Sequence, residues 1–167
     1  MKRFIISDTH FYHNAIMEYC KRPANYLELL IGNWSNMLKP EDVTYHLGDV
    51  HFGTEQQLKD ILKQIPGKKY LVRGNHDHWT DTKYLLCGFD GVFDAITLGD
   101  TLLTHEPTFI CGGVHKRNVH GHLHNLGYDG VPEFGGTYTV FNDGKHILYA
   151  PELQQYKPIH LQKLIKI

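Results

Sequence analysis

Residues 43–77 read VTYHLGDVHFGTEQQLKDILKQIPGKKYLVRGNHD, and this stretch decides the expected fold. The apolar run Val43–Leu47 predicts a strand, and Lys69–Val72 predicts another. Between them a helix is predicted over residues 54–65, because Thr54 can cap it with Gln57 at the third helical position. Strand, helix and strand in this order are typical of parallel strands in an α/β fold.

The flanking sequence extends this alternation and then changes character. Before residues 43–77 we predict a strand at Lys2–Ile6 and helices at Asn14–Cys20 and Tyr26–Leu38; after them we predict a hairpin at Phe93–Thr104, a strand at Arg117–His120 and a second hairpin at Tyr138–Tyr149. Helices therefore concentrate in the first half and hairpins in the second. The expected architecture is α/β, with two facing mixed β-sheets flanked by helices in one domain over residues 1–167.

The composition limits the classes of function. Among 167 residues, 17 Lys and Arg stand against 18 Asp and Glu, so the net charge of -1 predicts no extended nucleic-acid-binding surface. The N-terminal apolar run is too short for a signal peptide, and no run reaches membrane-spanning length. The three cysteines form no Cys-x-x-Cys pair, which fits reduced thiols and predicts a cytoplasmic protein. These features leave the oligomeric state open.

Histidine is the anomaly in the composition, and several of the 13 histidines lie in polar clusters that directly follow the apolar runs. The five clusters are Asp8-Thr9-His10, Gly48-Asp49, Gly74-Asn75-His76-Asp77, His105 and Gly121-His122-Leu123-His124. Ligand sites in open α/β sheets lie beyond the carboxyl ends of the strands, so the five clusters can converge on one pocket. On extended backbone, Asp8 with His10 and His122 with His124 would each point to one face.

Seven side chains in these clusters are candidate metal ligands: Asp8, His10, Asp49, Asn75, His105, His122 and His124. One divalent ion takes about four to six ligands, so seven ligands with one bridging carboxylate fit two ions. The set offers nitrogen and oxygen but no thiolate, which favours Mn, Fe, Zn or Ni over Ca. The expected cofactors are therefore two divalent metal ions, with Mn favoured.

The ordered set Asp-x-His, Gly-Asp, Gly-Asn-His-Asp, single His and Gly-His-x-His resembles the calcineurin-like metallophosphoesterases, in particular compact microbial phosphoesterases without a cap. The resemblance implies a four-layer α/β/β/α sandwich. It also implies that Asp8, His10 and His124 hold one metal, that Asn75, His105 and His122 hold the other, and that Asp49 bridges them. His76 would face the substrate as an acid or transition-state stabiliser.

Such a site predicts hydrolysis of a phosphate ester, a phosphodiester or a phosphomonoester, by a water or hydroxide that bridges the metals. Asp49 and His76 are then the catalytic residues, and the substrate is a phosphate-ester small molecule or a nucleotide. Residues beside the motifs are the candidates for substrate contact: Arg73, His13 and His51. Two alternatives stay open, a metal-dependent nuclease and, behind it, a non-catalytic metal-binding scaffold.

Four further positions bear on the substrate and on the support of the site. In protein Ser/Thr phosphatases a second Asp and an Arg follow the Gly-Asp block, whereas this chain has Phe52 and Gly53, which weakens a phosphoprotein phosphatase interpretation. Asp77 either caps a helix that starts near Trp79 or supports the site. Arg22 is either a phosphate ligand or a solvated surface charge.

Overall fold

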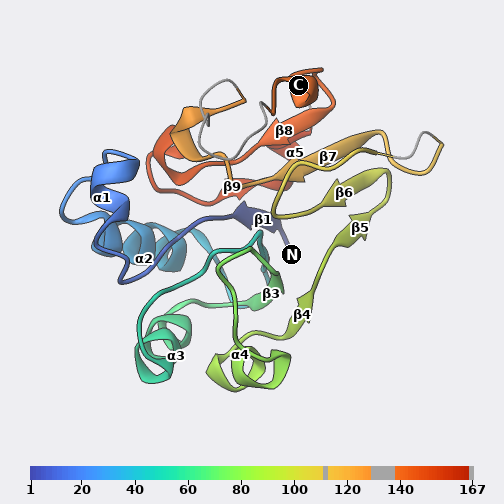
Figure 1. Cartoon of the computed structure of the whole chain (residues 1–167). Coiled ribbons are helices and arrows are strands. Elements are labelled where there is room, and N and C mark those ends of the chain that lie inside the picture. Colours follow the sequence, from blue (N-terminus) through green and yellow to red (C-terminus); the bar gives the residue numbers. More distant parts are fainter. Residues whose placement is uncertain (111–112, 129–137, 166–167) are drawn as a thin grey trace.

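The computed structural model describes residues 1–110, 113–128 and 138–165, and its strands form two mixed sheets (Figure 1). The first sheet has the order β4 (Gly91–Phe93), β3 (Lys68–Val72), β2 (Val43–His46), β1 (Arg3–Ile6) and β9 (Ile159–His160). The second has the order β5 (Ile96–Leu98), β6 (Thr101–Leu103), β7 (Arg117–His120) and β8 (His146–Leu148). Only β9 in the first sheet and β5 in the second run antiparallel to their neighbours.

Helices flank the sheets, and the longer ones come from the first half of the chain. The α-helices are α1 (Ile16–Tyr19), α2 (Tyr26–Met37), α3 (Glu55–Gln64), α4 (Asp81–Cys87) and α5 (Leu161–Leu164). Short 3-10 helices cover His124–Leu126, Tyr138–Phe141 and Pro151–Gln154. Figure 1 shows α2, α3 and α4 on the side of the first sheet that faces away from the second. No helix in the described residues is both long and apolar enough to cross a membrane.

One hydrophobic core joins the two sheets. Ile5 and Leu71 of the first sheet and Leu103 and Val119 of the second belong to the same buried cluster. Trp34 of α2 is fully buried in that cluster, and its indole N–H donates to a threonine hydroxyl of β2 at 3.0 Å. Each fully buried Leu, Ile, Val or Phe side chain of the cluster stabilises the fold by about 1.5–3 kcal/mol, because its apolar surface is removed from water. The core therefore fixes the two sheets relative to each other.

The structure confirms the predicted α/β fold with two mixed sheets flanked by helices. The capping box that starts α3 is also confirmed, because the Thr54 hydroxyl accepts from the Gln57 backbone N–H and the Gln57 side chain accepts from the Thr54 N–H. The predicted hairpin around Gly99 is present between β5 and β6. Its first strand is shorter than predicted, since Phe93 belongs to β4 and pairs with β3 in the other sheet.

The second predicted hairpin, at Tyr138–Tyr149, is wrong. Tyr138–Phe141 forms a 3-10 helix, and β8 pairs in parallel with β7 instead of with an adjacent antiparallel strand. Asp143 makes this turn, because its carboxylate accepts from the backbone N–H groups of Lys145 and His146. The sequence pattern of alternating apolar residues is the same for either partner, so it did not distinguish them.

Candidate metal centre

Five loops bring the predicted clusters together beyond the carboxyl ends of five strands. The loops follow β1, β2 and β3 in the first sheet and β6 and β7 in the second. Backbone hydrogen bonds join them, such as Asp8 N–H to Gly48 O at 2.9 Å and Gly121 N–H to His105 O at 2.9 Å. The predicted convergence of the clusters on one site is therefore what the fold produces.

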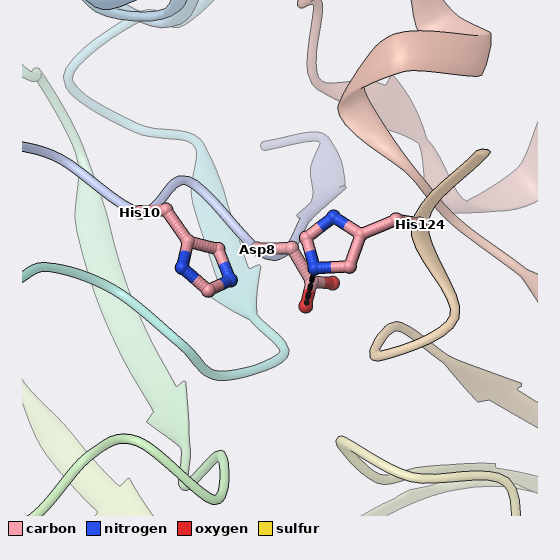
Figure 2. Close-up of side chains that lie close together, drawn as sticks. All are labelled: Asp8, His10 and His124. Carbon is pink, nitrogen blue, oxygen red and sulfur yellow. Dashed lines mark ion pairs between the residues drawn. The ribbon is translucent and has the colours of Figure 1, made fainter. Parts of the chain in front are cut away.

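A first group of donors consists of Asp8, His10 and His124, whose ligand atoms all lie within 4.8 Å of one another. Figure 2 shows the side chains of His10 and His124 extending toward Asp8 from opposite sides, with the His124 ring next to the Asp8 carboxylate. His124 Nε2 is 3.7 Å from Asp8 Oδ1. His10 Nε2 is buried and has no hydrogen-bond partner among the described residues, and burial lowers the pKa of this imidazole well below its usual range. A buried, neutral and unpartnered imidazole nitrogen is a donor suited to a metal ion.

A second group lies beside the first. His105 Nε2 is 2.8 Å from Asn75 Oδ1 and 3.2 Å from His122 Nδ1, and His122 Nδ1 is also 3.2 Å from Asn75 Oδ1. The side chain of Asn75 thus points to both histidines. The Tyr138 hydroxyl, at 3.4 Å from His122 Nε2, contacts the far side of that ring and was not anticipated from the sequence.

Asp49 lies between the two groups. Its Oδ2 is 3.6 Å from His10 Nε2 and 3.5 Å from His105 Nε2, while its Oδ1 accepts from the backbone N–H of His76 at 2.9 Å. The carboxylate is nearly buried, with 3% of its side chain exposed. One oxygen atom therefore faces a histidine of each group, as a shared ligand must.

The imidazole rings are oriented by hydrogen bonds on their outer nitrogens. His105 Nδ1 donates to the carbonyl of Leu47 at 2.7 Å, so Nε2 is the nitrogen that faces the centre and would bind a metal ion. His10 Nδ1 pairs with His13 Nδ1 at 3.1 Å, which leaves His10 Nε2 on the inside. Such outer partners fix the tautomer and the direction of metal-binding imidazoles. His13, one of the predicted substrate contacts, thus lies directly against a candidate ligand.

The charges of the centre are concentrated in its two carboxylates. Burial raises the pKa of Asp8. Burial opposes protonation of His124 and His105, but their charged neighbours outweigh it. The Asp8 carboxylate raises the pKa of His124 to about 10. The hydrogen bond with Asp49 and the charges of both carboxylates raise the pKa of His105 to about 9. Without a metal, the two carboxylates thus retain protons on neighbouring imidazoles. The two carboxylates, Asp8 and Asp49, therefore favour positive charge beside them.

The backbone that carries these side chains is not extended, contrary to the prediction for the Asp-x-His and His-x-His pairs. Asp8, His10, Asp49, His122 and His124 all have positive φ, between 45° and 70°. This left-handed region is uncommon for residues other than glycine. The pairs converge because the chain coils tightly at each strand end, and not because they share one face of a strand.

Two glycines allow the loops to approach closely enough. A Cβ atom at Gly121 would overlap Ser7 Oγ and Asp8 Oδ2, and a Cβ at Gly74 would overlap the side chain of Asp49. The small residues of the Gly-His-x-His and Gly-Asn-His-Asp clusters therefore serve mainly to leave room for carboxylates from other loops.

Asp77 supports the site and does not cap a helix. Its carboxylate accepts from the backbone N–H groups of Asp49 and Gly74, both at 2.8 Å, from Val50 N–H at 3.1 Å and from the Tyr84 hydroxyl at 3.2 Å. Thr80 provides the cap of α4. The sequence left both roles for Asp77 open, and the structure decides for the supporting one.

Arg22 is neither a phosphate ligand on the surface nor solvated. Its guanidinium group is fully buried, donates to the carbonyls of Thr9 and Asp8, and pairs with Glu152. Sequence reasoning missed Glu152 altogether, because nothing near it in the chain indicates a site and it lies 130 residues from Arg22.

The remaining predicted residues lie around the centre. His76 is at its mouth, with 45% of its side chain exposed and Nε2 at 4.0 Å from Asp49 Oδ2. The Arg73 guanidinium donates to the carbonyls of Asp77 and Trp79 and pairs with Asp81, so a phosphate contact would require it to leave these partners. The buried His51 ring packs edge-on against Trp79, with the ring centroids 4.2 Å apart.

Comparisons with known proteins find relatives of nearly the full length. An uncharacterized protein of Methanocaldococcus jannaschii is 29% identical over 177 residues, which cover 99% of this chain and 90% of that protein. The crystal structure of a protein of unknown function from Aquifex aeolicus matches with a TM-score of 0.77 and 28% identity, over 99% of this chain and 98% of that one. The nuclease MPE of Pseudomonas putida has a similar fold, with a TM-score of 0.54 and 22% identity over 73% of this chain and 61% of its own.

The sequence matches a known family over most of its length. The sequence model of the calcineurin-like phosphoesterases matches residues 1–158, a range that contains every candidate ligand described above and the supporting Glu152. The chain belongs to the calcineurin-like phosphoesterase family.

Proposed function

We propose that this chain is a dinuclear metallophosphoesterase that hydrolyses a phosphate ester. In this proposal Asp8, His10 and His124 hold one divalent ion, Asn75, His105 and His122 hold the other, and Asp49 is shared. The observation that carries it is the position of Asp49 Oδ2 between His10 Nε2 and His105 Nε2, at 3.6 and 3.5 Å, while the buried His10 Nε2 has no hydrogen-bond partner among the described residues. The donors are those that Mn, Fe, Zn or Ni accept, and Mn is the favoured ion.

The chemistry divides between the ions and the chain. When bound, two such ions lower the pKa of a water molecule and polarise the phosphoryl oxygens. His76 is placed to act on the substrate, because its imidazole is 45% exposed at the mouth while its backbone N–H is fixed by Asp49. A general acid must reach the oxygen of the leaving group, and His76 is placed to protonate it.

The substrate class that we propose is a phosphodiester or phosphomonoester of a small molecule or nucleotide. A metal-dependent nuclease is the second candidate, since the exposed position of His76 leaves room for a longer phosphodiester. The net charge of -1 favours the small substrate. A scaffold without catalysis is disfavoured, because all seven donors and His76 are retained. We further propose a cytoplasmic protein, in line with the buried free thiols of Cys20 and Cys87.

The test removes and restores the metal. Protein freed of metal by a chelator should be inactive toward aryl phosphate mono- and diesters, and added Mn²⁺ should restore hydrolysis with two ions bound per chain. Asp49→Asn should bind Mn²⁺ more weakly and lose nearly all turnover. Asp60→Asn, which changes an exposed carboxylate on α3, is the matched control and should behave as the wild type. Mn²⁺ binding at a single site, or full turnover in Asp49→Asn, would contradict the dinuclear proposal.

A further inference from the structure

We propose that Glu152 is a positioning residue for His124, and that Arg22 joins this pair to the backbone of the Asp8 loop. The proposal rests on the proposed function, because it concerns how one metal ligand is held. It is carried by a buried chain of contacts from Asp8 through Arg22 and Glu152 to His124, none of which the ligand assignment uses.

The first link is the ion pair. Arg22 has no exposed side-chain surface and Glu152 has 6%, and Arg22 Nε and Nη2 both lie 2.7 Å from Glu152 Oε1. Charged groups are buried in this way only when they are paired and hydrogen-bonded. The other donors of Arg22 satisfy this condition, since they reach Asp8 O at 2.7 Å and Thr9 O at 2.9 Å. The carbonyls of a strained ligand loop thus have a fixed partner.

The second link reaches the imidazole ring. Glu152 Oε1 is 3.4 Å from His124 Nδ1, while His124 Nε2 faces Asp8 Oδ1 at 3.7 Å. An ionised carboxylate can only accept, so this contact holds a proton on Nδ1 and leaves Nε2, which faces Asp8, as the nitrogen whose proton a metal ion would replace. Carboxylate partners of metal-binding histidines act in this way, by fixing tautomer and ring direction.

The two links together set the spacing between ligands from different sheets. Asp8 follows β1 of the first sheet, whereas His124 follows β7 of the second. Glu152 sits on the 3-10 helix Pro151–Gln154, which packs against the 3-10 helix that starts at His124. Arg22 donates to the backbone of the Asp8 loop and Glu152 contacts the His124 ring. The Arg22–Glu152 pair therefore links two ligands of the same group.

The same neighbourhood also has the donors of a third metal site, and its charge argues against that interpretation. The ligand atoms of Cys20, His124 and Glu152 lie within 4.8 Å of one another. The guanidinium of Arg22 is already bound to Glu152 there, and a second cation beside it would be repelled in a buried environment. The positive charge beside Glu152 is therefore the guanidinium group of Arg22, and we assign no metal ion to this cluster.

The experiment measures Mn²⁺ binding to metal-free protein by calorimetric titration, together with thermal unfolding of the metal-free form. Glu152→Ala should weaken one of the two sites about 10- to 100-fold and leave the other unchanged. Glu152→Gln keeps an oxygen that can accept from His124, so its affinity should fall between those of Glu152→Ala and the wild type. Gln154→Ala, on the same 3-10 helix, is the control and should bind as the wild type.

The outcomes separate this proposal from the proposed function. Wild-type protein that fails to bind two Mn²⁺ ions would overturn both. Two normal sites in the wild type with unchanged affinities in folded Glu152→Ala would overturn the positioning role alone, as would equal weakening of both sites with a lowered unfolding temperature. If Glu152→Ala does not fold, Glu152→Gln decides: weakening at one site supports the role, and unchanged affinity at both sites overturns it.

Discussion

At the scale of single residues, the candidate ligands stand on a strained backbone. Asp8, His10, Asp49, His122 and His124 all occupy the left-handed region, which costs of order 1–3 kcal/mol at each residue that is not glycine. Such conformations persist only where neighbouring groups over-determine them. Here those neighbours are buried: Asp77 holds the Asp49 loop and Arg22 holds the Asp8 loop. Strain gathered at the ligands fits a centre that is formed before any ion or substrate binds.

His76 provides the first residue-scale prediction. His76→Ala should keep close to the wild-type Mn²⁺ content and lose about 10²- to 10⁴-fold in turnover of a substrate with a poor leaving group, because a placed general acid contributes about that factor. A nitrophenyl ester needs less protonation and should show a smaller loss. Metal analysis and steady-state kinetics on the two substrates measure this. Loss of a metal would make His76 a ligand, and equal losses on both substrates would make it a stabiliser of phosphoryl charge.

Gly121 provides the second prediction at the scale of single residues. Gly121→Ala would push a methyl group into Ser7 and Asp8, and overpacking of this kind costs about 1–3 kcal/mol of unfolding free energy. It should also weaken metal binding, because Asp8 must move. Gly32→Ala is the control: its Cβ would meet nothing within 4 Å in α2, and alanine should stabilise that helix by about 0.5–1 kcal/mol. Denaturant unfolding of both variants tests this, and a fully stable Gly121→Ala would refute the close-approach argument.

At the scale of elements, the sequence predicted the start of a helix correctly where the contacts that fix it join residues close together in the chain. The start of α3 is fixed by Thr54 and Gln57, three positions apart, and it was predicted from them. The start of α4 is capped by Thr80, whose hydroxyl accepts from Lys83 N–H, whereas the sequence offered Asp77 as the cap of a helix near Trp79. Strands β8 and β9 give no comparable signal, since a strand of two or three residues is defined by its partner.

The cap of α3 carries the prediction at this scale. Thr54→Ala should lower the free energy of unfolding by about 0.5–2 kcal/mol, because the backbone N–H of Gln57 in the first turn loses its acceptor, the Thr54 hydroxyl. Thr82→Ala, at an exposed position inside α4, removes the same hydroxyl without a cap and should change stability little. Chemical denaturation of both variants provides the comparison, and equal effects would show that the cap contributes nothing specific.

At the scale of the whole molecule, ligands from both sheets make metal binding a stabilising interaction between them. At an Mn²⁺ concentration of 100 times the dissociation constant, each site should add about 2.7 kcal/mol. For a chain of this size, two sites should raise the unfolding temperature by about 10–20 °C. Calorimetric scans with and without Mn²⁺ measure the shift. Asp49→Asn should show a much smaller shift, and an equal one would argue against a shared carboxylate.

Access to the centre gives the last prediction. The His76 side chain is 45% exposed, so the described residues leave part of it open to solvent. Diesters should therefore be hydrolysed at least as well as monoesters, because the second ester group can extend into solvent. Comparing kcat/KM for an aryl diester and the corresponding monoester at saturating Mn²⁺ tests this. A strong preference for small monoesters would instead point to a pocket that closes over the substrate.

The sequence by itself determined the α/β class, the order of the five clusters and the chemical identity of the donors. These properties are local. Periodicity, turn residues and ligand type can be read within a few positions of the chain, and strand ends then place the clusters at one edge. For the same reason, the candidate ligands could be named before any coordinate was known.

Only the tertiary structure decided how those ligands are held. From the sequence, Arg22 could have been a solvated charge. In the structure it is buried beside Glu152, 130 residues away, and hydrogen-bonds to the Asp8 loop. The left-handed backbone at Asp8 and His124 is likewise imposed by contacts with other loops, since neither residue prefers it locally. Such features depend on which distant segments are packed together, and on the low dielectric that packing creates, which no local pattern encodes.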